Sequence, residues 1–417
     1  MSSALKSYEE ALAVVSAQAR HLSLRRRLIE QVDLGSASGR VLATPIFADR
    51  DQPPFARSTR DGYACRAAEA RTHAFLPVVG SIRAGEVLAG PLPHGVVCEI
   101  MTGAPVPDGA DSVVMLEHVE AAGADIRLSD ARTVEPGENI VAQGGEAREG
   151  DELAPAGTRL AHAHIAVSAA CGYASLPVFS RPRVAILATG DELVPVEATP
   201  GPGQIRNSNA PMLAAMVTAA GGKPVVLPRA ADDAEALDAA LDQAARADLL
   251  LVSGGVSAGK FDLVEEALAR AGAEFHFTGV RIQPGKPLVF GQLPRGSGAD
   301  AQIQPLFGLP GNPISSAVTF LLFVTPMLSS LAGATEPASR FALARLAKDC
   351  KGKPGLTRFV PAHCAFNPAP GELPEVAAVS WQGSGDLAAF ARSNCFLVVP
   401  DGQDRLHAGE TVRILLS

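Results

Sequence analysis

Two glycine-rich stretches decide how this chain is interpreted: Ser253-Gly254-Gly255-Val256-Ser257-Ala258-Gly259 and Gly308-Leu309-Pro310-Gly311-Asn312-Pro313. Each follows or overlaps an apolar run typical of a buried strand, Asp248–Val252 for the first and Pro305–Phe307 for the second. A glycine backbone can approach a phosphate closely, and a helix N-terminus behind such a loop adds free N–H groups and partial positive charge. We therefore expect a site for a phosphorylated or oxyanionic small molecule.

The segment around these loops, residues 181–335, alternates between strand and helix patterns. This alternation is typical of right-handed βαβ units and predicts an α/β domain with a parallel sheet. The Asn209 side chain is expected to cap the first helix, and Asp233 the second. The expected strands are Arg183–Ala188, Val225–Leu227, Asp248–Val252 and the run before Gly308, and the expected helices are Pro211–Ala220, Ala234–Ala245, Leu263–Arg270 and Ser315–Leu328.

The flanking parts of the chain have a different pattern. Residues 7–31 have the spacing of a helix that opens on a Ser7/Glu10 capping box. From about 45 to 180 the apolar runs are short and broken by glycine turns, as in β structure. Residues 336–417 contain five further strand patterns and predict a small sheet or barrel. At 417 residues, the chain is long enough for two to four domains.

Composition excludes several classes of function. A formal net charge of -8 argues against a nucleic-acid surface, which needs concentrated Lys and Arg. The 6 cysteines form no C-x-x-C pair, which indicates a reduced, cytoplasmic compartment. The most apolar stretch, Ala317–Leu328, is too short to span a bilayer and contains Pro326, so we expect a buried core helix and no membrane association.

Acidic side chains follow the expected strands at the edge where ligands bind in parallel sheets. The carboxylates of Glu192, Asp232 and Asp262 are hard oxygen ligands. They suit an Mg²⁺ ion that bridges phosphate oxygens. Lys286, in Pro284-Gly285-Lys286-Pro287, would add positive charge. Each acid taken alone is better explained as a helix cap or a solvated loop residue than as a metal ligand. Their joint position at strand ends favours a site.

Two segments of the β-rich half place polar residues at tight glycine turns. Asp61 lies in Asp61-Gly62-Tyr63-Ala64, and Thr102 lies in Met101-Thr102-Gly103-Ala104-Pro105-Val106-Pro107. An Asx-turn and a capping threonine explain them as well as a functional role does.

Together these segments resemble the molybdopterin molybdenumtransferase family, which includes MoeA and the matching domain of gephyrin-type proteins. The resemblance rests on the Asp61 and Thr102 segments, on Thr189-Gly190-Asp191-Glu192-Leu193, on both glycine loops with Asp262, and on the Lys286 segment, all in family order. It implies a multidomain α/β plus β subunit with a central domain like that of MogA and MoaB. The implied parts are 1–48 with 145–180 (domain I, linking and dimer-forming), 49–144 (β-rich domain II), 181–335 (α/β, molybdopterin-binding) and 336–417 (C-terminal β-barrel).

The resemblance also implies an activity: insertion of molybdate into adenylylated molybdopterin, with release of AMP, to give molybdenum cofactor. It implies a homodimer whose active site is shared between subunits, with molybdopterin adenylyltransferase and molybdoenzyme-maturation proteins as partners. By resemblance, the catalytic residues are Asp61, Thr102, Glu192, Asp232 and Asp262, of which Glu192, Asp232 and Asp262 hold Mg²⁺. The implied substrate-binding residues are Gly190, Ser253, Gly254, Gly255, Ser257, Lys286, Pro310, Gly311, Asn312, Pro313 and Ser384.

Two alternatives stay open at this stage. A molybdopterin adenylyltransferase uses the same α/β domain, but its loop typically reads Gly-Gly-Thr-Gly, whereas this chain has Gly254-Gly255-Val256-Ser257. A non-catalytic cofactor carrier or scaffold is expected to have lost acids that are present here. The chain departs from the family pattern at Gln283, Lys260, Val141, Ala147 and Leu356. Of these, Lys260 is predicted to replace the charge of a lysine that many relatives carry at position 283.

Overall fold

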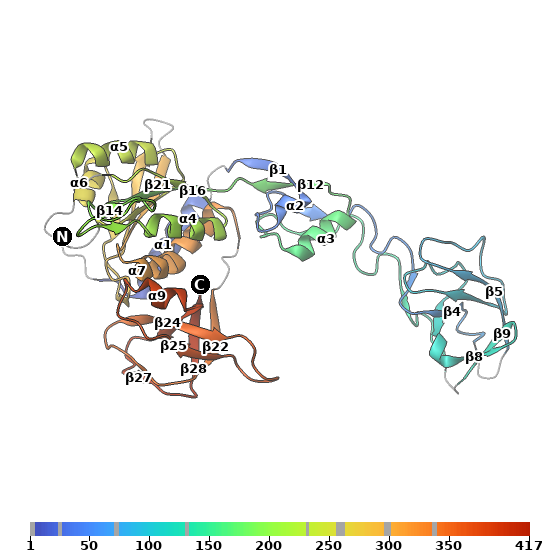
Figure 1. The fold of residues 1–417 in the computed structure, drawn as a ribbon. Coiled ribbons are helices and arrows are strands. Elements are labelled where there is room, and N and C mark those ends of the chain that lie inside the picture. Colours follow the sequence, from blue (N-terminus) through green and yellow to red (C-terminus); the bar gives the residue numbers. More distant parts are fainter. Residues whose placement is uncertain are drawn as a thin grey trace.

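The chain forms an elongated molecule whose parts follow one another in a row. A computed structural model describes residues 5–23, 27–70, 75–129, 133–230, 233–255, 263–295, 302–335 and 340–417. At one end lie an α/β domain and a β-barrel packed against each other, a small α+β domain follows, and a separate β-rich domain forms the other end (Figure 1). The predicted multidomain fold is therefore present. The domain boundaries themselves stay a prediction.

The α/β domain is built on a six-stranded sheet with the order β16-β13-β17-β21-β20-β18. The first four strands are parallel, as predicted, whereas β20 runs antiparallel to both of its neighbours, β21 and the edge strand β18. The strands are β13 (Arg183–Ala188), β16 (Lys223–Val226), β17 (Leu249–Ser253), β18 (Glu274–Phe277), β20 (Val289–Arg295) and β21 (Gln302–Leu309), and a small parallel pair, β14 (Leu193–Val194) with β15 (Ile205–Arg206), lies beside them.

Helices cover both faces of this sheet because its central strands are apolar on both sides. In β13, Val184 and Ile186 face α4 and the helix after β21, whereas Ala185 and Leu187 face α5 and α6. The helices are α4 (Asn209–Ala219), α5 (Ala234–Ala244), α6 (Leu263–Arg270), α7 (Pro313–Thr319), a π-helical turn η3 (Phe320–Val324) and α8 (Thr325–Leu331). Asp233 caps α5 as predicted, since its carboxylate accepts a hydrogen bond of 2.9 Å from Ala236 N.

The first helix differs from prediction in length and in place. The capping box forms as expected, with Ser7 N to Glu10 Oε2 at 2.7 Å and Glu10 N to Ser7 Oγ at 3.1 Å. However, α1 spans Tyr8–Ser23, and residues 29–31 lie in a strand. Within the described residues the buried stripe runs to Leu22, and its next positions, Arg25 and Arg26, lie outside the described part of the chain. That stripe packs in the core of the α/β domain, not in the implied domain I.

The apolar segment after β21 is longer than expected. Residues 313–331 form one continuous helical segment, long and apolar enough by length and composition to cross a membrane. However, 78% of its most apolar window is buried inside the protein. The segment therefore serves as the core helix of the α/β domain.

The middle domain joins two distant parts of the chain. Strand β1 (Ile29–Asp33) pairs antiparallel with β12 (Ser175–Phe179), and β2 (Ile46–Phe47) pairs with β11 (Glu152–Ala154). The helices α2 (Leu34–Ala37) and α3 (His162–Ala170) lie beside the β1/β12 pair (Figure 1).

The end domain contains a six-stranded sheet with the order β7-β4-β6-β5-β9-β8. Its strands are β4 (Gly62–Cys65), β5 (Leu76–Ile82), β6 (Val97–Ile100), β7 (Ser112–Met115), β8 (Val119–Ala122) and β9 (Asp125–Leu128), with a 3-10 turn η1 (Leu116–His118) and a two-residue pair, β3 (Arg57–Ser58) with β10 (Ile140–Val141), alongside.

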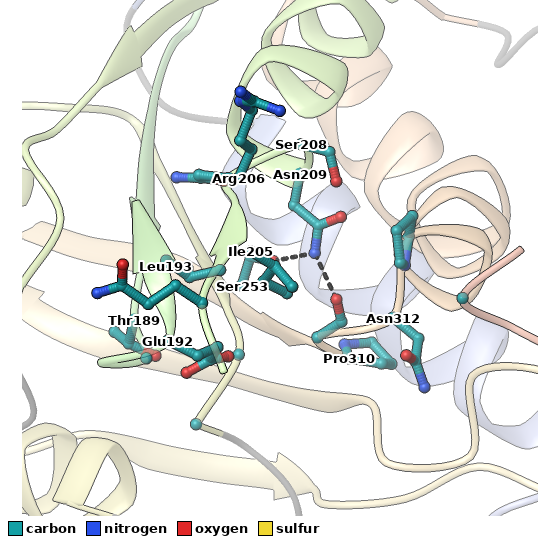
Figure 2. A pocket seen from close by; sticks show the side chains of 18 of the residues that line it. Thr189, Glu192, Leu193, Ile205, Arg206, Ser208, Asn209, Ser253, Pro310 and Asn312 are labelled. Carbon is teal, nitrogen blue, oxygen red and sulfur yellow. Dashed lines mark hydrogen bonds between the residues drawn. The ribbon is translucent and has the colours of Figure 1, made fainter. Parts of the chain in front are cut away.

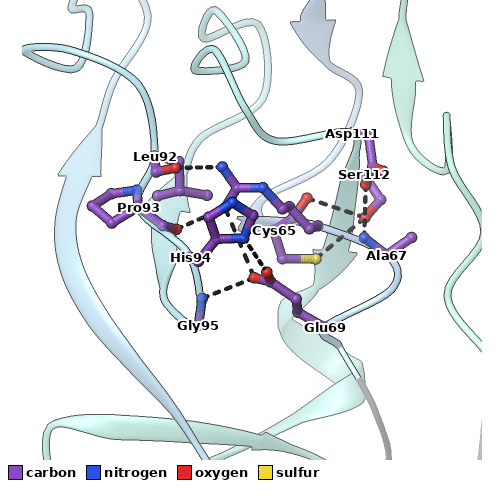
Figure 3. Close-up of polar contacts among 10 residues, drawn as sticks. Cys65, Ala67, Glu69, Leu92, Pro93, His94, Gly95, Asp111 and Ser112 are labelled. Atoms are coloured by element: carbon purple, nitrogen blue, oxygen red, sulfur yellow. Dashed lines mark hydrogen bonds and ion pairs between the residues drawn. The ribbon is translucent and has the colours of Figure 1, made fainter.

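A polar clamp holds one loop of this domain in place (Figure 3). The Arg66 guanidinium donates to the carbonyl oxygens of Leu92 and Pro93, at 2.6 and 2.7 Å. The Glu69 carboxylate accepts from Gly95 N at 2.9 Å and contacts His94 Nδ1 at 2.6 Å. Two charged side chains thus fix the loop that leads into β6.

The C-terminal part is a closed five-stranded barrel, as predicted. The ring runs β24-β25-β22-β28-β26 and closes through pairing of β24 with β26. Closure leaves no free edge for β24 or β26 to pair with another chain. The strands are β22 (Phe341–Leu346), β24 (Thr357–Ala365), β25 (Glu375–Ala378), β26 (Cys395–Val399) and β28 (Thr411–Leu416), with short strands β19 (Ile282–Gln283), β23 (Cys350–Lys351) and β27 (Arg405–Leu406) and helix α9 (Leu387–Ala391).

Candidate active site at the ends of the parallel strands

A cleft of about 950 Å³ opens where the parallel strands β13, β17 and β21 end. This is the edge at which open α/β sheets bind ligands. We call it the strand-end cleft. It is lined by Thr189, Gly190, Glu192, Leu193, Pro200, Gln204, Ile205, Arg206, Asn207, Ser208, Asn209, Ser253, Gly254, Gly255, Pro287, Pro310, Gly311, Asn312, Pro313, Gly385 and Leu387.

The first glycine loop leaves β17 in a conformation that favours glycine. Gly254 and Gly255 have φ angles of 91° and 64°, and a Cβ atom on Gly254 would lie 2.8 Å from the carbonyl oxygen of Thr189. The Gly254 N–H donates to Leu309 O at 3.2 Å, which leaves the Gly255 N–H as the nearer candidate for an anion contact. Ser257, which was predicted to bind substrate, lies outside the described residues.

The second loop leads from β21 into α7. Pro310 and Pro313 have no N–H, and Ile314 N donates to Ser384 O at 3.0 Å. In the described part of the chain, the N–H groups of Gly311 and Asn312 donate to no other residue, so they are the available anion donors of this loop. A Cβ on Gly311 would lie 3.8 Å from Gly254 Cα, so the two glycine loops lie against each other.

Asn209 connects these two loops, and its predicted role was wrong. Its side-chain nitrogen donates to Ser253 Oγ at 2.9 Å and to Gly311 O at 2.7 Å (Figure 2). It does not cap the helix, because α4 begins at Asn209 itself, and Asn207 Oδ1 accepts from Ala210 N at 3.1 Å instead. The run Asn207-Ser208-Asn209 carried a signal for this. Three cap-forming residues in a row exceed what one helix start needs.

Glu192 lies in the cleft beside Gly190. Its carboxylate is exposed and folds back over Gly190, where an added Cβ would lie 2.5 Å from Glu192 Oε2. It makes no ion pair with any other described residue, so its oxygens are open to a cation from solvent. The described residues hold no group of three or more His, Cys, Asp or Glu side chains that could bind a metal. Asp232 and Asp262, the other two predicted ligands, lie outside the described part.

Lys286 and Ser384 lie next to the cleft. Lys286 is exposed and precedes Pro287, which lines the cleft. Ser384 connects the barrel to α7 through its carbonyl oxygen, and its neighbour Gly385 lines the cleft. Arg206, at the end of β15, is a lining cation that was not among the predicted site residues, and its Nε donates to Ala198 O at 3.0 Å.

Asp61 and Thr102 form a second constellation, in the domain at the other end of the molecule. Asp61 Oδ1 accepts hydrogen bonds from Thr102 N at 2.7 Å and from Thr102 Oγ1 at 2.8 Å. These bonds, the backbone one above all, hold the pKa of Asp61 below its usual range. Both side chains are exposed. The pair belongs to the domain of β4, well separated from the α/β domain in this chain (Figure 1).

Matches to known proteins cover most of the chain. Residues 6–172 match the family model described as the MoeA N-terminal region (domain I and II), residues 185–330 match a probable molybdopterin binding domain, and residues 343–417 match the MoeA C-terminal region (domain IV). Molybdopterin molybdenumtransferases from Nostoc sp. and Bacillus subtilis are each 36% identical to this chain. The two alignments each cover 93% of this chain, and they cover 88% of the Nostoc protein and 89% of the Bacillus protein.

A solved structure is similar along its full length. The molybdopterin biosynthesis moeA protein from Pyrococcus horikoshii OT3 matches with a TM-score of 0.78 and 28% identity, over 99% of this chain and 100% of that chain. The fold, the strand-end cleft and the relatives together define the class of this protein. It is a multidomain transferase whose central domain matches a probable molybdopterin binding domain. The chain belongs to the molybdopterin molybdenumtransferase (MoeA) family. The adenylyltransferase alternative is not favoured, because the N-terminal and C-terminal MoeA regions are both present.

Proposed function

We propose that this enzyme transfers molybdenum from molybdate to adenylylated molybdopterin in the strand-end cleft, releasing AMP. The observation that carries the proposal is the paired arrangement of two glycine loops at one sheet edge, next to the Glu192 carboxylate, which forms no ion pair with any described residue. The reaction joins a phosphate-bearing molecule to a second oxyanion, molybdate. Two adjacent sets of N–H donors, around Gly255 and around Gly311 with Asn312, suit such a pair of anions.

Each part of the cleft has a role in this proposal. The first loop binds the phosphates of the adenylylated pterin, and the second binds molybdate. Lys286 and Arg206 add positive charge at the rim. Glu192, with Asp232 and Asp262, would hold Mg²⁺, for which carboxylate oxygens are the preferred ligands. When bound, that cation offsets charge on the phosphate oxygens.

The active form is proposed to be a homodimer with a shared site. Asp61 and Thr102 form an ordered, exposed carboxylate–hydroxyl pair, yet their domain lies apart from the cleft of the same chain. A second subunit could bring its pair to this cleft, and Asp61 would then face the bound substrate. The proposed location is the cytoplasm, and the cofactor would pass to molybdoenzyme-maturation proteins.

Hybrid dimers test the shared site. Asp61→Asn and Glu192→Gln each inactivate both sites of their own homodimer in this scheme. When the two variants are mixed through unfolding and refolding or coexpression, half of the dimers are hybrids with one intact site. We expect about a quarter of the parent activity to return. If each site instead used Asp61 and Glu192 of the same chain, every site in the hybrids would carry one substitution. The mixture would then stay inactive, and that result would contradict the shared site.

The metal role of Glu192 has its own test. Glu192→Gln should lower molybdenum transfer and weaken Mg²⁺ binding measured by calorimetry. Glu197→Gln is the matched control, since Glu197 is exposed nearby but does not line the cleft. Equal Mg²⁺ affinity in the parent and Glu192→Gln would contradict this assignment.

A further inference from the structure

Two large apolar side chains remain exposed inside the strand-end cleft. Ile205, in β15, is 57% exposed, Leu387, the first residue of α9, is 43% exposed, and both line the cleft. A single exposed apolar residue is ordinary on a protein surface. A concave site is different, because ligand pockets use apolar side chains to hold the organic part of a ligand and a few polar groups to orient it.

Ile205 belongs to an apolar wall beside the first glycine loop. It is the partner of Leu193 in the parallel β14/β15 pair, so the two side chains lie next to each other on one face, and both line the cleft (Figure 2). Ile205 N donates to Glu192 O at 2.8 Å. Thr189 N donates to Ser253 O at 3.1 Å, so the chain between these two bonds connects the wall to β17, which carries the first loop.

Leu387 reaches the cleft from the barrel, beside the second glycine loop. The segment that leads to it contacts this loop at two points. Ser384 O accepts a hydrogen bond from Ile314 N at 3.0 Å, and a Cβ added to Gly385 would lie 3.5 Å from Asn312 Oδ1. The cleft therefore combines the N–H donors of both loops with an exposed apolar side chain beside each of them.

We infer that Ile205 and Leu387 are specificity-determining residues that pack against the flat nitrogen heterocycle of a phosphorylated ligand, while the glycine loops hold its phosphate. Inorganic phosphate and molybdate have no apolar surface, so neither anion gains from these side chains. A purine or pterin ring does gain, because its apolar faces displace water from the exposed isoleucine and leucine. The inference rests on the proposed function for the ligand, whose two rings, adenine and the pterin, share this chemistry.

The test compares AMP with ribose 5-phosphate, which is AMP without adenine, by calorimetry with the full-length protein. Ile205→Ala and Leu387→Ala should each weaken AMP binding about three- to tenfold, the effect of losing part of one aliphatic contact. Ribose 5-phosphate should bind to both variants as it binds to the parent. A merely structural role of either side chain would instead weaken the binding of both ligands together.

Two further variants serve as controls. Val196 lies between β14 and β15 and is 53% exposed, but it does not line the cleft. Val196→Ala should therefore bind both ligands as the parent does. Ile205→Leu keeps the apolar volume at the wall, so it should retain most of the AMP affinity that Ile205→Ala loses.

Turnover of the adenylylated substrate shows which ring is bound. If the side chains pack against adenine, AMP loses affinity as stated. If they pack against the pterin, AMP binds to the alanine variants as it binds to the parent. The KM for adenylylated molybdopterin, measured from AMP release, then rises about three- to tenfold with kcat unchanged.

The outcomes separate this inference from the proposed function. The inference is overturned if both alanine variants keep the parent's AMP affinity and the parent's KM, or if AMP and ribose 5-phosphate lose affinity equally. Neither result affects the proposed function, which requires only molybdenum transfer by the parent. If the variants lose AMP affinity as expected but the parent transfers no molybdenum, the proposed function fails and the ring contact stands.

Discussion

Replacement of Gly254 by alanine tests how tightly the first glycine loop is built. The residue has a φ of 91°, and the new Cβ would lie 2.8 Å from the carbonyl oxygen of Thr189, which is backbone and cannot rotate away. The left-handed conformation costs an alanine about 1 to 2 kcal/mol. The steric overlap adds about 1 to 3 kcal/mol, as for an overpacked core. We therefore expect Gly254→Ala to lower the free energy of unfolding by roughly 2 to 5 kcal/mol in total.

Gly203→Ala provides the matched control, because it separates backbone strain from the overlap. Gly203 has a φ of 77°, but an added Cβ would meet nothing within 4 Å, and the residue does not line the cleft. The Gly203→Ala variant should therefore lose only the cost of backbone strain, about 1 to 2 kcal/mol of unfolding free energy. Each kcal/mol corresponds to about 2 to 4 °C in the melting temperature of a domain of this size.

Thermal unfolding and AMP binding are measured on both variants. Gly254→Ala should melt several degrees below Gly203→Ala. It should also bind AMP at least about tenfold more weakly than the parent, because relieving the overlap moves the loop that carries the Gly255 N–H. Gly203→Ala should keep the parent's AMP affinity. If the two variants melt together and bind AMP equally well, the loop is not constrained by Thr189 and the reasoning is refuted.

Three further predictions concern other parts of the chain. Asp61→Asn should abolish molybdenum transfer while the melting temperature stays near that of the parent, since Asp61 is exposed; early melting with full activity per folded molecule would instead indicate a turn cap. The contact with His94 lowers the pKa of Glu69, so this acid contributes stability above its ordinary pKa, and the contribution is lost as the pH falls through the lowered value. The unfolding free energy should therefore fall less steeply with acid in Glu69→Gln than in the parent, and identical slopes would exclude a role for the clamp. All 6 cysteines are buried, and burial raises the pKa of Cys65 to about 11 and that of Cys395 to about 12. Native protein at neutral pH should react with a thiol reagent only as fast as it unfolds, and rapid labelling would contradict the buried positions.

Local patterns in the sequence predicted most of the α/β domain. Alternation of apolar strands with amphipathic helices located β13, β17, α5 and α6 within a residue or two, because these elements are defined by their own residues. The antiparallel strand β20 and the edge strand β18 were not predicted, since strand pairing and direction depend on connections that no local pattern records. The first helix was extended too far because helical spacing could not predict that residues 29–31 pair with β12, which lies far away in the chain.

The candidate site was predicted in part. Gly190, Glu192 and the two glycine loops meet at one cleft because parallel strands bring their carboxyl ends to one edge. Asn209 was missed because its partners, Ser253 and Gly311, lie 44 and 102 residues away in the chain. Helix capping is a local rule and cannot anticipate such contacts. Asp61 and Thr102 were singled out at glycine turns and given a functional role through resemblance, and their bond to each other appears only when β4 and β6 pair.

The most direct test of the central claim measures AMP released by the purified protein from adenylylated molybdopterin, with and without molybdate. A transferase that couples the two anions in the strand-end cleft should release AMP only when molybdate is present, one molecule for each molybdenum bound in the product. AMP release at the same rate without molybdate, or without bound molybdenum, would contradict the account.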